Sequence, residues 1–174
     1  MIRDMTKYIV LLRAVNVGGT GKLPMRDLQA MCADAGLRKP QTYIASGNVV
    51  FESRAGAAKV KADLEARLLA YAGKPIGVVV RTAAEMTAVL NANPFPQAAA
   101  QRTVAIFLDA SPPTDALGCA TGVNDEQMRL GVREIYVHYR SGIGKSRLNI
   151  PAAKAGTARN MNTVAVLARM AAEL

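Results

Sequence analysis

The sequence predicts an α+β protein made of two ferredoxin-like halves, each a split βαβ unit. Two observations predict this fold class. Across residues 1–81, strand and helix patterns alternate in the order β-α-β-β-α-β. Across residues 103–174, the order is β-α-β-β-α, which is the same unit without its last strand. No repeated sequence connects the halves, so element order alone indicates a structural duplication in one compact unit. Residues 82–102 form the linking helix and loop.

The first half begins with the segment KYIVLLRAV, a short apolar and β-branched run typical of a buried strand. After it, Pro24 suits a first helical position, and apolar residues recur at helical spacing over residues 28–35 until Gly36 ends the helix. The segment QTYIASGNVVFES predicts two strands, at residues 42–45 and 49–52, because turn residues separate them.

Apolar residues at helical spacing predict a second helix, and Gly73 and Pro75 close it: Val60, Leu64, Leu68 and Tyr71. The segment IGVVVRT supplies the next strand. Thr82 and Glu85 then form a capping box, which predicts the start of the linking helix.

The second half opens with a strand, TVAIFLD, followed by a short helix predicted over residues 112–120. The segments EQMRLG and EIYVHY predict two more strands. A final helix follows, with Asn160 as its N-cap and one apolar face: Met161, Val164, Leu167, Ala168 and Ala171.

Composition narrows the class of protein. Half of the 174 residues are hydrophobic, which is typical of a globular chain, and Arg13 interrupts the first apolar run. We therefore expect a soluble, cytoplasmic protein. One His and two distant Cys provide no metal-site spacing. The formal charge of +9 favours anionic partners, although the basic residues are spread along the chain.

Polar stretches at residues 16–22, 46–48, 141–147 and 157–163 are rich in glycine, asparagine and cations. Glycine lets backbone N–H groups approach a ligand, asparagine both donates and accepts, and lysine or arginine supplies charge. At the last stretch, Arg159 and the N-terminal end of a helix favour one bound anion. The alternatives are a tight turn, a solvated basic loop and a simply capped helix.

Two familiar nucleotide motifs are incomplete. A phosphate-binding P-loop requires an earlier glycine, but Asn16 and Tyr139 stand at that position before Gly21-Lys22 and Gly144-Lys145. A dinucleotide fingerprint fails because Pro24 stands where its third glycine belongs. The stretches at residues 16–22, 46–48 and 141–147 contain no acidic residue, and no base accompanies their serines, so the sequence assigns neither a cofactor nor a reaction.

Several segments, in this order, resemble a bacterial family known as domain of unknown function 1697: YIVLLRAVNVGG, KLPM, TYIASGNVVFES, NPF, IYVHYRSGIGKSRL and ARNMNT. The resemblance covers nearly the whole chain. Ala14 stands where the family usually has glycine, and Met161 where it usually has tryptophan. The resemblance implies an α+β protein with two ferredoxin-like halves, and it brings no established substrate.

The resemblance also implies a set of signature positions, which we take as the predicted ligand-binding residues: Arg13, Asn16, Gly18, Gly19, Lys22, Ser46, Gly47, Asn48, Ser146, Arg159, Asn160 and Thr163. The leading hypothesis is a protein that binds a phosphate-bearing or other anionic small molecule. One alternative is nucleic-acid binding through a basic surface. The small number of aromatic residues argues against this alternative. The other is a structural protein that acts through a partner interface.

Overall fold

The computed structural model describes residues 4–17 and 22–174. The chain divides into two compact units, the first formed by residues 1–86 with 167–174 and the second by residues 87–166. In the described residues the fold is mixed α+β, with two four-stranded antiparallel sheets and four α-helices. No helix in this part of the chain is long and apolar enough to cross a membrane.

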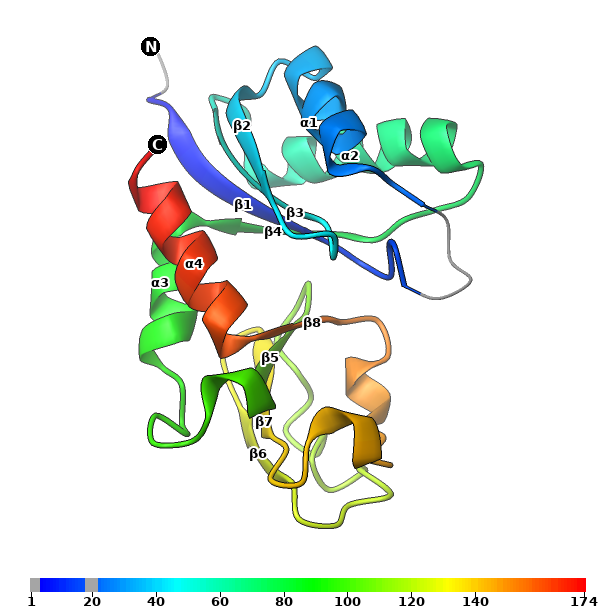
Figure 1. The fold of residues 1–174 in the computed structure, drawn as a ribbon, viewed down its shortest axis with the longest axis vertical. Coiled ribbons are helices and arrows are strands. Elements are labelled where there is room, and N and C mark those ends of the chain that lie inside the picture. Colours follow the sequence, from blue (N-terminus) through cyan, green and yellow to red (C-terminus); the bar gives the residue numbers. More distant parts are fainter. Residues whose placement is uncertain (1–3, 18–21) are drawn as a thin grey trace. The chain divides into compact units, whose positions relative to one another are not determined.

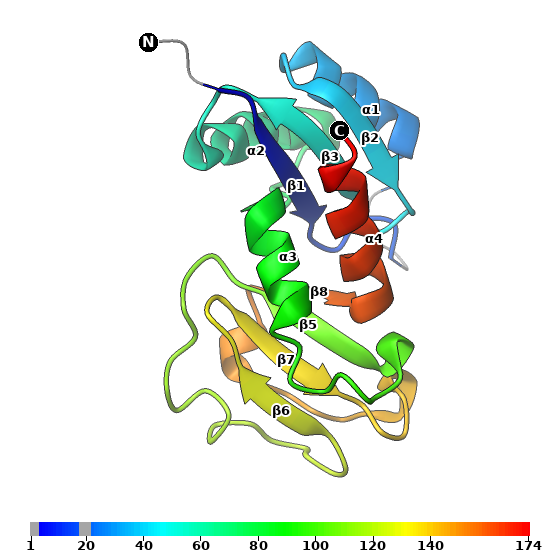
Figure 2. The same cartoon turned by 90° about the vertical axis from the view of Figure 1, so that its left-hand side faces the viewer.

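The first unit contains one sheet in the order β2-β3-β1-β4, with antiparallel pairing between all neighbours. Helices α1 and α2 lie on one face of this sheet (Figures 1 and 2). The bounds of these elements are β1 (Thr6–Leu12), α1 (Met25–Asp34), β2 (Arg38–Tyr43), β3 (Asn48–Ser53), α2 (Ala57–Ala72) and β4 (Val78–Thr82).

The core of the first unit forms between that sheet face and the two helices. Alternate residues of β1 and β3 point toward the helices, among them Val10 and Phe51, and Leu28 and Leu64 pack against them. The intervening strand residues, such as Ile9, are also fully buried. Burial on both faces explains why β1 has a continuous apolar sequence instead of an alternating one.

Strand β2 differs from its prediction at residues 42–45. It begins at Arg38, its pairing with β3 shifts register between Arg38 and Gln41, and Ile44 has a positive φ in the following turn. Lys39, Pro40 and Gln41 are not typical strand formers, so the sequence pattern missed this part. An edge strand tolerates proline because one side of its backbone has no partner strand.

Helices α3 (Ala83–Asn91) and α4 (Met161–Ala172) begin at the predicted caps. The Thr82 N–H donates to Glu85 Oε2 over 3.0 Å, and the Glu85 N–H donates to Thr82 Oγ1 over 3.1 Å. At α4, the Thr163 N–H donates to Asn160 Oδ1 over 2.9 Å. Both predicted caps are therefore confirmed.

The second unit contains the sheet β6-β7-β5-β8, also antiparallel. Its strands are β5 (Thr103–Phe107), β6 (Gln127–Leu130), β7 (Glu134–His138) and β8 (Thr157–Asn160). The prediction that the second half lacks its last strand is wrong, because Thr157–Asn160 pairs with β5. The sequence pattern missed β8 because a four-residue strand containing alanine, arginine and asparagine gives almost no β signal.

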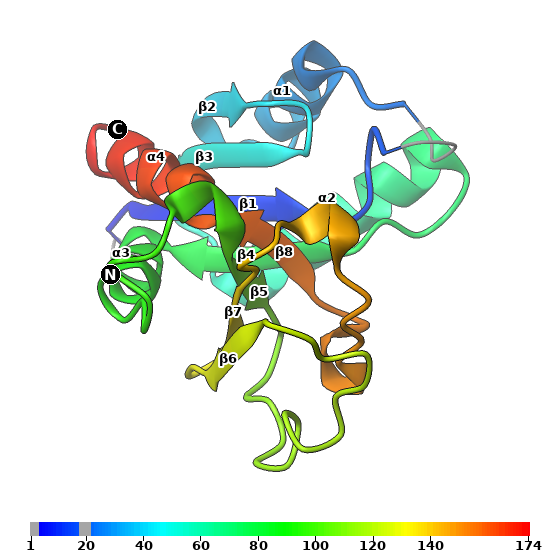
Figure 3. The same ribbon diagram turned by 60° about the horizontal axis from the view of Figure 1, so that its bottom comes forward.

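The predicted helix at residues 112–120 is also wrong. Between β5 and β6 the chain forms turns and a long loop (Figure 3). Gly118 and Gly122 weaken any helix there, and a Cβ on Gly122 would lie 2.1 Å from the Arg147 carbonyl oxygen. Between β7 and β8 only 3₁₀ turns occur, at Ile143–Lys145 and Pro151–Ala153. The second unit therefore lacks the helices of a split βαβ unit at these connections, and a ferredoxin-like duplication is not confirmed.

Candidate anion-binding site

Asn16 fixes the loop that follows β1. Its Nδ2 donates to the carbonyl oxygens of Leu23 and Ala45, both over 2.8 Å, and its Oδ1 accepts from the Leu23 N–H over 2.7 Å. Asn16 has a φ of 54°, a left-handed conformation that asparagine tolerates better than most residues. One side chain therefore ties the end of the loop to its beginning and to the turn between β2 and β3.

That turn contains the predicted residues 46–48. Gly47 has a φ of 88°, and its carbonyl oxygen accepts from the Leu12 N–H over 2.8 Å. The buried Asn48 side chain donates to the Tyr43 carbonyl and to Ser46 Oγ, over 2.8 and 2.9 Å. The structure thus brings Asn16 and residues 46–48 together, and the Asn16 and Asn48 side chains donate to protein atoms. Their ligand-binding role stays a prediction.

A pocket of about 240 Å³, the lysine pocket, lies beside this loop. It is lined by Ala14, Val15, Lys22, Leu23, Tyr71, Ala72, Lys74 and Ile76. The predicted Lys22 and the unpredicted Lys74 bring two cations to one cavity. The Tyr71 hydroxyl donates to Asp27 Oδ2 over 3.0 Å, and this hydrogen bond to a carboxylate raises the pKa of Tyr71.

The remaining predicted residues of the first unit have different positions. The Arg13 N–H donates to the Gly77 carbonyl over 3.0 Å, next to Ala14 and Ile76 of the lysine pocket. Gly18 and Gly19 lie outside the described residues. Sequence reasoning missed Lys74 because Gly73 and Pro75 around it indicate only the end of a helix. No sequence signal connected Lys74 with Lys22, because their proximity depends on how α2 packs.

In the second unit, Arg159, Asn160 and Thr163 lie together where β8 joins α4. Arg159 is only 9% exposed, and its Nη1 donates to the Ala158 carbonyl over 2.9 Å. Burial lowers the pKa of Arg159 to about 10, because an apolar environment disfavours the charged guanidinium. The solvated arginine considered from the sequence is therefore excluded, whereas the capped helix is present.

Ser146 follows the 3₁₀ turn Ile143–Lys145 in the connection between β7 and β8. Its Oγ donates to a carboxylate oxygen of Glu126 and accepts from the Leu148 N–H over 3.1 Å. The hydrogen bond from Ser146 is the main cause that lowers the pKa of Glu126. A serine that donates to a carboxylate and fixes a loop has a sufficient structural role, and its ligand-binding role stays a prediction.

Two further observations concern reactive groups. His138 Nδ1 lies 3.2 Å from Thr103 Oγ1, and its ring packs 6.1 Å from that of Phe95. Across residues 4–17 and 22–174, no three His, Cys, Asp or Glu side chains lie together in a way that could hold a metal ion.

Comparison with known proteins agrees with the fold. No curated protein matches the chain. The structure is similar to that of the conserved bacterial protein SP0830 from Streptococcus pneumoniae, with a TM-score of 0.80 and 23% sequence identity, over 97% of this chain and 99% of that one. At this identity the similarity concerns the fold alone. The family described as "Protein of unknown function (DUF1697)" matches residues 5–136, and the chain belongs to this family.

Proposed function

We propose that the protein binds a small anionic molecule, such as a phosphate ester, in the lysine pocket. The observation that carries the proposal is that Lys22 and Lys74 line one pocket to which, among the described residues, no acidic side chain contributes. Two ammonium groups around a cavity of this size create a positive potential that favours a phosphate or carboxylate.

The wall of this pocket is held in place before any ligand arrives. Asn16 fixes Leu23, a pocket residue, through two hydrogen bonds, and Gly47 packs against Val15, another pocket residue. A preformed wall reduces the entropy lost on binding.

Arg159, Asn160, Thr163 and Ser146 remain predicted ligand-binding residues of the second unit. Arg159 carries a charge in a mostly buried position, which is costly unless polar groups surround the guanidinium. Replacing Arg159 by alanine is expected to weaken binding of an anion at the second unit about ten- to hundredfold if its guanidinium makes a charge-assisted bond there. An unchanged affinity in a folded variant would remove Arg159 from the predicted ligand-binding residues of the second unit.

The hypothesis that the two halves are a structural duplication is supported by two similar strand-to-helix connections. One joins β4 to α3, and the other joins β8 to α4. Arg81 lies opposite Ile9 and precedes the capping residue of α3, while Arg159 lies opposite Ala105 and precedes the capping residue of α4. The strand orders β2-β3-β1-β4 and β6-β7-β5-β8 also correspond. We propose that the two sheets derive from one ancestral unit, and that the second copy lost the helices corresponding to α1 and α2.

The experiment that tests the binding proposal is a calorimetric titration with inorganic phosphate, ribose 5-phosphate and a short RNA. The proteins are the wild type, Lys22→Gln, Lys74→Gln and, as a control, Lys154→Gln from an exposed turn of the other unit. We expect each pocket variant to lose affinity for ribose 5-phosphate by about tenfold, because each removes one charge-assisted contact.

Equal affinity in wild type and both pocket variants would contradict the proposal. Binding of RNA alone, with a steep loss of affinity as salt rises, would instead support the nucleic-acid alternative. The charge of +9 favours that alternative, but the first sheet has buried residues on both faces, and its Phe51 is in the core. That sheet thus lacks the exposed aromatic platform on which RNA bases stack.

A further inference from the structure

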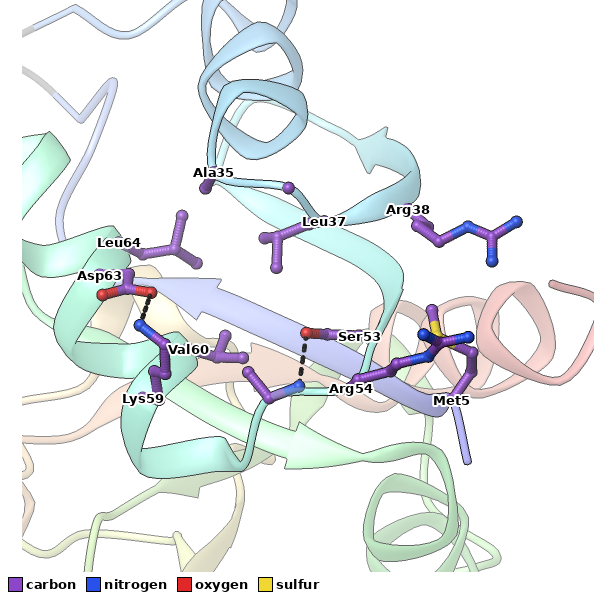
Figure 4. Close-up of a pocket in the computed structure, with 12 residues that line it drawn as sticks. Met5, Ala35, Leu37, Arg38, Ser53, Arg54, Lys59, Val60, Asp63 and Leu64 are labelled. Atoms are coloured by element: carbon purple, nitrogen blue, oxygen red, sulfur yellow. Dashed lines mark hydrogen bonds and ion pairs between the residues drawn. The ribbon is translucent and has the colours of Figure 1, made fainter. Parts of the chain in front are cut away.

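A second and larger pocket lies in the first unit, with a volume of about 400 Å³. The ends of α1 and β3, the start of β2 and the first turns of α2 surround it (Figure 4). We call it the arginine pocket, after Arg38 and Arg54. It is separate from the lysine pocket, which lies near the start of α1 and the end of α2.

Among the described residues, three cations line this pocket, and two of them have no acidic partner within this part of the chain. Lys59 pairs with Asp63 over 2.9 Å, and Asp63 is the only acidic residue among the described ones that line the pocket. Arg38 and Arg54 make no side-chain hydrogen bond or ion pair with the rest of the described chain, and in Figure 4 both lie away from the Lys59–Asp63 pair. The positive charge of the pocket is therefore not neutralised from within.

The start of α2 increases this positive potential. Its N-cap, Gly56, provides no side-chain oxygen for the first N–H groups, and its first turn contains Lys59 and no acidic residue. A cation at a helix N-terminus is unfavourable because it meets the positive end of the helix dipole. In contrast, α1 has Asp27 and α3 has Glu85 in the first turn. The start of α2 therefore keeps the partial positive charge of its dipole beside the pocket, while Lys59 itself pairs with Asp63.

One wall of the arginine pocket is apolar. Leu37, Val60 and Leu64 line it and belong to the core of the first unit, and Ala55 packs beside them. Inorganic phosphate would not use this wall, whereas a phosphate ester with an apolar or aromatic group would bury that group against it. Cations and an apolar wall in one cavity thus specify an amphipathic anion.

We propose that the arginine pocket is a ligand site for an organic phosphate with an apolar body. The planar guanidinium groups of Arg38 and Arg54 present paired N–H donors that match the geometry of phosphate oxygens. The organic group lies against Leu37 and Ala55. This site does not depend on ligand binding in the lysine pocket, because the two pockets share no lining residue.

The test is a nuclear magnetic resonance titration of the full chain with phenyl phosphate and, separately, inorganic phosphate. The variants are Arg38→Gln, Arg54→Gln and their combination. Arg129→Gln, an exposed arginine of β6, is the matched control, and Lys22→Gln with Lys74→Gln reports on the other pocket. The amide spectrum of each variant verifies that it is folded.

With wild type, we expect phenyl phosphate to shift the amide resonances of Leu37, Ala55 and Val60. Each arginine variant is expected to weaken the binding that these amides report about tenfold, because each loses a charge-assisted hydrogen bond, while the Arg129→Gln control keeps wild-type affinity. Inorganic phosphate is expected to bind more weakly than phenyl phosphate, since it cannot use the apolar wall.

Three results would overturn the proposal. Unchanged affinity in the folded Arg38→Gln, Arg54→Gln double variant would remove the arginines from the site. Loss of binding only in the lysine variants would assign phenyl phosphate to the lysine pocket. Equal affinity for phenyl phosphate and inorganic phosphate would show that the ligand needs no apolar group. Because each pocket has its own variants, failure here and failure of the proposed function are distinguishable.

Discussion

Gly47 shows how one residue fixes the loops around the lysine pocket. Its φ of 88° is a conformation that residues with a Cβ rarely adopt, and a Cβ there would lie 2.8 Å from Leu12 Cβ and from Val15 Cγ2. The close approach brings the turn between β2 and β3 against the end of β1. Close packing and a positive φ therefore explain the need for glycine at position 47 without any contact to a ligand.

Gly47→Ala is expected to lower the free energy of unfolding by about 2 to 4 kcal/mol, because backbone strain and a steric clash add. The matched control is Gly73→Ala at the end of α2, where φ is 71° but no atom lies within 4 Å of the added Cβ. That change should cost about 1 to 2 kcal/mol, from the backbone alone. Urea unfolding curves measure the free energy of unfolding of both variants. Equal losses in the two variants would show that the structure around residue 47 shifts to accommodate the added Cβ.

Cys32 is expected to resist alkylation in the folded protein. It is fully buried in α1, and burial raises the pKa of its thiol to about 12, despite the opposing charge of Arg67, so the reactive thiolate is scarce at neutral pH. Cys119 is exposed and provides the internal control. Mass spectrometry after iodoacetamide treatment should find modification at Cys119 alone, and at both residues in urea. Rapid modification of Cys32 without denaturant would contradict its burial.

Among the elements, caps were easier to predict than short strands. The capping box at Thr82 and the N-cap at Asn160 require only residues that are close in sequence, and both are present. Strand β8 depends on pairing with β5 far earlier in the chain, and β2 begins with a register shift at an edge. Residues that are close in sequence therefore predict a helix cap, but they do not show which distant strand a short strand will pair with.

Asn160→Ala is expected to destabilise the protein by about 1 kcal/mol, since the Thr163 N–H loses its side-chain acceptor. Asn162→Ala is the control, because Asn162 is exposed in the same helix. Thermal unfolding of the two variants should show a lower midpoint only for the cap variant. Similar midpoints would mean that water replaces the lost acceptor without cost.

At the scale of the whole molecule, the free energy of unfolding depends on pH through the hydroxyl of Tyr136 in the second unit. Its hydroxyl donates to the Val89 carbonyl over 2.9 Å. Burial, with a smaller contribution from Glu134, raises the pKa of Tyr136 from 10.0 to about 12. Between these values the unfolded chain has lost this proton and the folded chain retains it. The stability that the Tyr136 hydroxyl contributes to the folded protein is therefore fully present below pH 10, and it decreases as pH rises toward 12.

Tyr136→Phe removes the titrating group, so the stability difference between wild type and this variant should decrease as pH rises above about 10. Urea unfolding at several pH values up to about 11 measures it, with Tyr43→Phe as a control for loss of a half-buried phenol. The opposite effect of Arg159, whose pKa burial lowers to about 10, is the same in both chains and cancels. A constant difference would refute the raised pKa.

The sequence by itself determined the α+β class, the first six elements in order, the two helix caps and the family, because these depend on local periodicity, on caps and on short motifs. Only the tertiary structure decided that Thr157–Asn160 is a strand, that residues 112–120 form no α-helix, and that Lys74 joins Lys22. The arginine pocket likewise exists only in the fold, since the end of α1 and the start of α2 meet there. These features depend on long-range packing, which adjacent residues do not encode.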